Sequence, residues 1–133
     1  MNTRRLLFPL ATLSLLYATA CSGGRDVEVT GSIGSGVAAA EPVRVEFYDV
    51  IGEGEDRSLE LVHDISLTTE REFAETVALE GDFVLVRAIH DADADGACTE
   101  GESWAEQEAA IAEDDSVEAV SLDLKAQACP VQE

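Results

Sequence analysis

Basic side chains are scarce in this sequence. It has 8 lysine and arginine residues against 28 aspartate and glutamate residues, and its formal net charge is −20 over 133 residues. Nucleic acids and anionic lipid headgroups are recognised by clustered lysine and arginine, and the sequence has no such cluster. We therefore expect no nucleic-acid partner. The acidity indicates a cationic or basic partner, or simply a soluble surface.

Catalytic motifs are also missing. No serine nucleophile motif, metalloprotease helix motif or phosphate-binding loop occurs. The only histidines are His63 and His90. His63 falls on the apolar face of a predicted strand, as a core or edge histidine does, and the single Trp104 is more typical of a core cap than of a sugar platform. We expect no enzymatic activity.

The N-terminus is typical of a secretory leader. Arg4 and Arg5 give a positive start, an apolar stretch of about 15 residues follows, and the small residues Ala18 and Ala20 precede Cys21. The apolar stretch is shorter than the roughly 20 residues that an uncleaved membrane-spanning helix requires. We predict that residues 1–20 are a signal peptide.

Two cleavage routes are compatible with this leader. The segment from Ala18 to Cys21 resembles a bacterial lipobox, although Ala18 stands where leucine is usual, and ordinary signal peptidase could cut at the same place. Lipidation is favoured because it uses a third cysteine that would otherwise be an odd exposed thiol. Residues 21–25 then form a lipidated cysteine with a short tether. Ser22 resembles the residue that directs enterobacterial lipoproteins to the outer membrane, so we predict a lipid anchor in the bacterial cell envelope, at the outer membrane.

Apolar residues alternate with polar residues along most of the remaining chain. This period of two predicts half-buried strands, and turn-forming stretches separate them. The predicted strands include residues 27–33, 43–48, 59–67, 73–79, 83–86 and 117–124. In the strand at 59–67 the alternation places Leu61 and His63 on the apolar face. The run Phe83-Val84-Leu85-Val86 is apolar on both faces, which suits a central strand. Short strands at this spacing predict one all-β domain over residues 26–133, an antiparallel β-sandwich of about seven strands.

Residues 102–113 are ambiguous between a helix and a strand. Their alanine, glutamate and glutamine content favours a helix. A sandwich, however, needs a partner for the strand at 117–124, and the intervening EDDS turn offers a hairpin. We predict a strand that pairs with 117–124.

Residues 91–102, DADADGACTEGE, match the calcium-loop pattern D-x-[DN]-x-[DN]-G-x5-E. The predicted Ca²⁺ ligands are oxygen atoms of five residues, since hard oxygen donors without thiolate or imidazole favour Ca²⁺ over Zn²⁺. These are the side chains of Asp91, Asp93, Asp95 and Glu102 and the carbonyl of Ala97. A strand precedes the loop, so the paired-helix opening of a calcium sensor is not expected. The alternative is a solvated acidic turn without an ion.

Cys98 lies inside this loop and Cys129 lies near the C-terminus. In an oxidising compartment the two could form one disulfide bond, and the alternative is a pair of free buried thiols.

The step Arg71-Glu72-Phe73 and the run LEGDFVLVRAIHDADADGACTEGE resemble the prealbumin-like, carboxypeptidase-regulatory-like type of bacterial β-sandwich. That resemblance implies a non-catalytic accessory domain. We therefore expect a calcium-stabilised envelope lipoprotein with a structural or interaction role. The alternative is a surface module that binds carbohydrate or peptide through Trp104 and nearby loops.

Overall fold

The computed structural model describes residues 24–34, 42–90, 98–99 and 102–130. These residues form eight strands and one short 3-10 turn, η1 (Gly54–Asp56). The strands are β1 (Arg25–Ile33), β2 (Val43–Ile51), β3 (Ser58–Leu67), β4 (Glu72–Leu79), β5 (Phe83–His90), β6 (Ser103–Ala110), β7 (Ser116–Leu122) and β8 (Lys125–Ala126).

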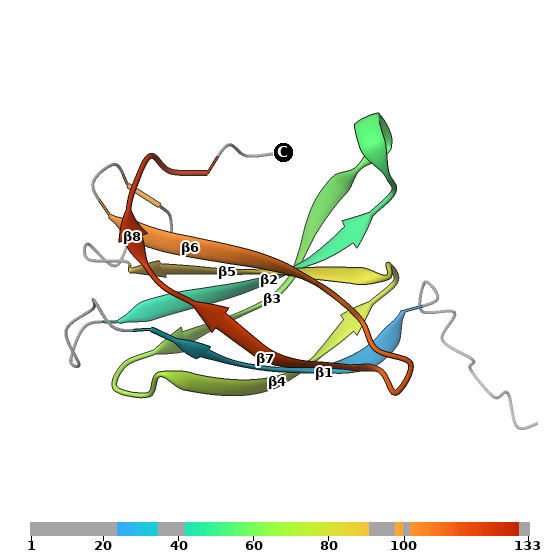
Figure 1. Cartoon of the computed structure of the whole chain (residues 1–133), viewed down its shortest axis with the longest axis horizontal. Helices are drawn as coiled ribbons and strands as arrows, with labels where there is room; N and C mark the ends of the chain where they lie inside the picture. Colours follow the sequence, from blue (N-terminus) through green and yellow to red (C-terminus); the bar gives the residue numbers. More distant parts are fainter. Residues whose placement is uncertain (1–23, 35–41, 91–97, 100–101, 131–133) are drawn as a thin grey trace, which may run out of the picture.

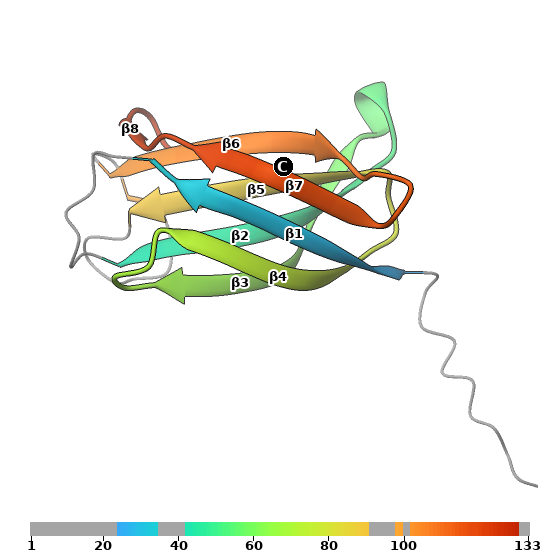
Figure 2. The ribbon, with the colours of Figure 1, turned by 60° about the horizontal axis from the view of Figure 1, so that its bottom comes forward.

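The strands form two layers, as Figures 1 and 2 show. A five-stranded sheet has the order β3-β2-β5-β6-β8, and a three-stranded sheet has the order β4-β1-β7. The prediction of an all-β sandwich is confirmed. The prediction of a strand in the ambiguous segment is also confirmed, because β6 occupies Ser103–Ala110.

The core lies between the two sheets and is built from the alternating apolar residues of both. Fully buried members include Val27, Val29, Phe47, Leu79 and Val86. The prediction that Phe83-Val84-Leu85-Val86 belongs to a central strand is confirmed, since β5 has neighbours on both sides and is buried on both faces from residue 84 to residue 89. Backbone pairing on both sides and burial on both faces favour a largely apolar run, which here is interrupted only by Arg87.

The predicted pairing of the strand at 117–124 with residues 102–113 is wrong. β6 belongs to the five-stranded sheet, whereas β7 pairs with β1 in the other sheet, and that pair is parallel. The turn at 111–115 therefore carries the chain from one layer to the other. After β7 the chain returns as β8, which pairs with β6 at Ser103 and Trp104 only. A hairpin signal in the sequence does not distinguish a turn within one sheet from a turn between sheets.

Leu61 differs from the predicted alternation. Phe47 of β2 pairs with His63, but the next residue, Tyr48, pairs with Leu61, so Val62 is an extra residue in β3. This β-bulge reverses the facing of the residues before it. Leu61 therefore lies on the outer face, 47% exposed, although the sequence placed it on the apolar face. Figure 1 shows the hairpin end that carries η1 bending away from the three-stranded sheet.

Candidate functional site

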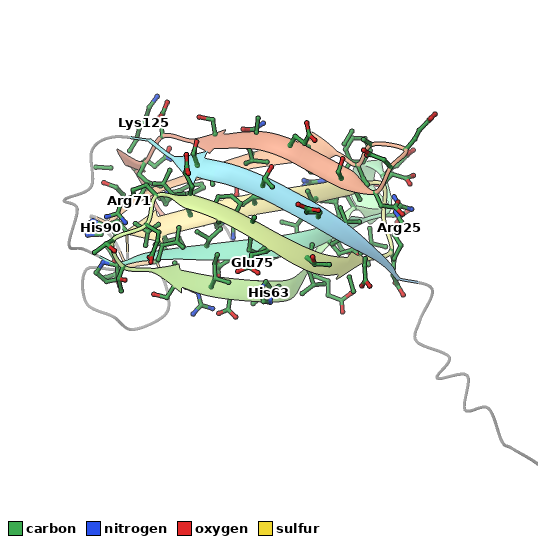
Figure 3. The ribbon with its side chains drawn as sticks, turned by 90° about the horizontal axis from the view of Figure 1, so that it is seen from below. Arg25, His63, Arg71, Glu75, His90 and Lys125 are labelled. Atoms are coloured by element: carbon green, nitrogen blue, oxygen red, sulfur yellow. A yellow bond between two sulfur atoms is a disulfide. The ribbon has the colours of Figure 1, made fainter. Side chains whose placement is uncertain are left out.

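The two ends of the sandwich carry different features. At one end, Arg25 forms ion pairs with Asp82 (3.8 Å) and Asp115 (3.1 Å) and donates a hydrogen bond to the Gly81 carbonyl (3.3 Å). His90, the last residue before the predicted calcium loop, lies at the opposite end, as Figure 3 shows. The start of β1 is thus separated from His90 by the length of the strands.

Most of the predicted calcium ligands lie outside the described residues, namely Asp91, Asp93, Asp95 and Ala97. Glu102 is described and is only 7% exposed. Its Oε1 accepts a hydrogen bond from the Thr99 N–H at 2.5 Å, and its own N–H donates to the Thr99 carbonyl at 3.0 Å. Among the described residues no group of three or more histidine, cysteine, aspartate or glutamate side chains is placed to hold a metal ion. Calcium binding by the loop stays a prediction.

The predicted disulfide is present. Cys98 and Cys129 are bonded, with a Cα–Cα distance of 5.8 Å and 31 residues of sequence separation. The segment before Cys129 is also held against β6: the Trp104 indole N–H donates to the Ala128 carbonyl at 2.8 Å, and the Gln127 amide donates to the Trp104 carbonyl at 2.9 Å. The C-terminal segment is thereby attached to the acidic loop and to the sheet edge. Cys21 lies outside the described residues.

His63 lies at the β3 edge, as predicted. Its ring centroid is 5.6 Å from that of Phe47, and its Nε2 is 3.7 Å from a carboxylate oxygen of Glu75 on β4. Figure 3 shows the two labelled side chains close to each other at the edge formed by β3 and β4. The contact lies between β3 and β4, which belong to different sheets.

The outer face of the five-stranded sheet is the main feature that sequence reasoning missed. The strand registers place side chains of β3, β2, β5 and β6 in four rows across this face. From the hairpin end the rows are Leu59–Val50–Phe83–Ala110, Leu61–Tyr48–Leu85–Glu108, Asp64–Glu46–Arg87–Glu106 and Ser66–Arg44–Ile89–Trp104. The first two rows are largely apolar and the third is wholly charged. The alternation of Arg44, Glu46 and Tyr48 in one strand was the available signal, but it did not reveal their cross-strand partners.

The charged row is organised around two buried ions. Arg87 is 7% exposed and donates to Glu106 through Nε (2.9 Å) and Nη2 (2.8 Å). Its guanidinium also lies over the Tyr48 ring, 4.9 Å from the centroid. Glu46, also 7% exposed, accepts hydrogen bonds from Arg44 Nε (3.2 Å) and the Tyr48 hydroxyl (3.1 Å). Each buried charge therefore has a charged partner, as burial of a charge requires.

Tyr48 joins the charged row to the apolar rows. Burial raises the pKa of its phenol above the usual value, and the neighbouring Glu46 carboxylate raises it further, while Arg87 acts in the opposite direction. The phenol therefore stays protonated over a wide pH range, and its O–H donates a hydrogen bond to Glu46.

Asp49 fixes the turn that leads into β5. It is 2% exposed, and its two carboxylate oxygens accept the backbone N–H groups of Glu80 (2.8 Å) and Gly81 (2.9 Å). A Cβ at position 81 would lie 2.1 Å from the Val50 carbonyl oxygen, so the close approach requires glycine there. Asp49 thus positions Phe83 two residues further on.

Several hollows lie elsewhere among the described residues. One, of about 660 Å³, lies on the three-stranded sheet and is lined in part by the acidic residues Glu28, Glu72, Asp114, Asp115 and Glu118. A second, of about 410 Å³, lies between β6 and the β7–β8 segment and is lined in part by Trp104. Trp104 is partly buried, so it is neither a core cap nor a fully exposed platform.

No family model, no curated protein and no solved structure matched this chain. The resemblance to prealbumin-like sandwiches therefore stays a prediction. None of the described residues forms a helix that is long and apolar enough to cross a membrane.

Proposed function

We propose that this chain is a lipid-anchored β-sandwich of the bacterial cell envelope with a non-catalytic structural or interaction role. The observation that supports it most is the Cys98–Cys129 bond. Disulfides persist in oxidising compartments outside the cytoplasm and are favoured in small domains that have only a modest core. An exported domain is the class of protein in which such a bond is expected.

The position of Arg25 supports an anchor at one end of the sandwich. Cys21, the proposed lipidated residue, lies only four residues before Arg25 in the sequence. An anchor there places the end with Asp82 and Asp115 nearest the membrane. The end with Cys98 and Cys129 is then directed away from it.

Calcium binding by residues 91–102 is part of this proposal. A buried carboxylate is unusual in proteins unless it is paired, hydrogen-bonded or bound to a metal. Glu102 is 7% exposed and its carboxylate bonds to the Thr99 N–H of the same segment instead of extending into solvent, which is compatible with a ligand role beside Asp91, Asp93 and Asp95. Ca²⁺ would relieve the mutual repulsion of these four charges.

Metabolic labelling with a fatty acid tests the anchor. The wild-type protein should carry label and sediment with membranes, and Cys21→Ala should lose both properties. Cys98→Ala is the matched control, because it also removes one cysteine but should remain labelled. Label retained by Cys21→Ala would overturn the anchor, and unlabelled wild-type protein would favour release by ordinary signal peptidase.

A module that binds carbohydrate or peptide is the second candidate. The position of Trp104 supports it, because the ring lines the 410 Å³ hollow and stands 5.8 Å from the Arg87 guanidinium. Its fluorescence would respond to a ligand in that hollow. The indole N–H already donates to the Ala128 carbonyl, so a ligand in the hollow would contact the ring and not the N–H.

A further inference from the structure

The outer face of the five-stranded sheet carries an apolar patch, which we define as Leu59, Leu61, Val50, Phe83 and Leu85. Among the described residues, Leu61 and Phe83 are the exposed large hydrophobic residues, with 47% and 44% of their surface accessible to solvent. Both belong to the first two rows of one face. Exposed large apolar side chains that gather on one face, with charged residues around them, mark interaction sites more often than scattered single ones do.

The fold directs these side chains outward. Leu61 is turned out by the extra residue Val62 in β3, and bulges commonly re-aim side chains in this way. Phe83 is held by the turn that Asp49 caps through the N–H groups of Glu80 and Gly81. Two separate structural features thus act on the two exposed members of one patch.

An ion pair joins the two sides of the patch. Arg57, which directly precedes β3, reaches Glu108 on β6, with Nη2 and Oε1 2.6 Å apart. In the sheet, β2 and β5 lie between β3 and β6. The Arg57–Glu108 pair therefore reaches across the two strands that carry Val50 and Leu85. Val50 and Leu85 are 6% and 5% exposed, whereas Leu61 and Phe83 are open to solvent.

The charges around the patch select the sign of the partner. Asp64, Glu106 and Glu108 have side-chain exposures of 47%, 35% and 39%, whereas the arginines paired with them are 26%, 9% and 31% exposed. The carboxylates are therefore nearer to solvent than the cations, on a chain whose net charge is −20. A second copy or an anionic lipid surface would be repelled, and a basic segment would be attracted.

We propose that the apolar patch binds an extended, basic polypeptide segment. Its apolar side chains cover Leu61 and Phe83, and its lysine or arginine side chains meet Glu108 and Glu106. An extended partner suits this face because rows on the sheet and alternate residues of an extended chain share the same spacing, about 7 Å. The inference rests on the proposed interaction role but on neither the lipid anchor nor the calcium loop.

Fluorescence anisotropy with a labelled peptide tests this inference on the protein as the cell makes it. The probe is a peptide of about a dozen residues that alternates lysine and valine. The control peptides have the same length and alternate glutamate with valine or lysine with serine. We expect binding of the lysine–valine peptide only, weakened by salt. Leu61→Thr with Phe83→Thr should weaken it about tenfold or more. Both changes are at exposed positions, and the melting temperature checks that the fold is retained.

The matched charge control compares Glu108→Gln with Glu118→Gln, since Glu118 is an exposed acid on β7 of the other sheet. Only Glu108→Gln should weaken the peptide. Equal binding by the double threonine variant, or equal loss from both glutamine variants, would show attraction to a general acidic surface and overturn the site. The wild-type protein could fail to bind the peptide and instead self-associate or sediment with phosphatidylglycerol vesicles. If the double variant loses that property, the patch is assigned to a second copy or to a membrane, and the inference is overturned. A protein acylated at Cys21 that binds no lysine–valine peptide would overturn this inference and leave the envelope role standing.

Discussion

Replacement of Asp49 by alanine should destabilise the domain by about 3 kcal/mol. The side chain is 2% exposed and supplies the acceptors for two backbone N–H groups, at 2.8 and 2.9 Å. A hydrogen bond to a charged group contributes about 1.5–3 kcal/mol. Two such bonds are lost here, and the lower end of that range applies because Glu80 is exposed and Gly81 is half-buried. At about 4–8 °C per kcal/mol for a domain of this size, the melting temperature should fall by roughly 10–25 °C.

Urea unfolding followed by circular dichroism measures this change. Asp49→Asn should give an intermediate loss, because an amide keeps one acceptor oxygen and presents a donor to the other N–H. Asp26→Ala is the control, since Asp26 is an exposed acid on β1, and surface substitutions of this kind usually stay within about 0.5 kcal/mol. If Asp49→Ala costs less than about 1 kcal/mol, the carboxylate does not hold the turn in solution and the account of Phe83 positioning fails.

Three further outcomes are expected. Calcium should raise the melting temperature, because binding to the folded state adds about 2.7 kcal/mol of stability when the calcium concentration is a hundred times Kd. Asp91→Ala with Glu102→Ala should abolish this rise. An unchanged wild-type melting curve would show that the loop is an acidic turn without an ion. Reduction of the Cys98–Cys129 bond should cost roughly 3–4 kcal/mol on the chain-entropy model, measured as a shift in the urea midpoint, and freely alkylated thiols in native protein would contradict the bond. Because the pKa of Tyr48 is raised in the folded protein, its contribution to stability is complete below the unfolded value of 10.0 and is lost as pH rises through the folded value. Tyr48→Phe should flatten the loss of stability above the unfolded pKa. In a protein prepared without residues 1–20, Tyr48 is the sole tyrosine, so a phenolate absorbance titration of that protein should show the raised pKa.

Several elements could be predicted from residue order alone because their cause is local. The alternation of apolar and polar residues in β2 and β4 indicates strands with one buried face. The continuous apolar run at 83–86 indicated a strand with neighbours on both sides, which β5 confirms. The disulfide was an expectation from the number of cysteines and from a predicted oxidising compartment, without any distance.

Pairing between strands could not be read in the same way. The turn after Ala110 has the local chemistry of a hairpin, yet β6 and β7 enter different sheets because each completes a different layer around the core. Leu61 shows the same limit: one extra residue, Val62, reverses the facing of everything before it in β3, and no residue type announces it.

The sequence by itself determined the all-β class, the apolar positions of most strands and the acidic balance, and it offered Cys98–Cys129 as a possible pair, because periodicity, composition and cysteine count are properties of nearby residues or of totals. Only the tertiary structure decided that Arg87 would be buried between Glu106 and Tyr48, that Asp49 would cap a turn 31 residues away, and that Leu61 and Phe83 would share one face. These arrangements depend on the register between strands distant in the chain, and register is selected by the packing of the whole core.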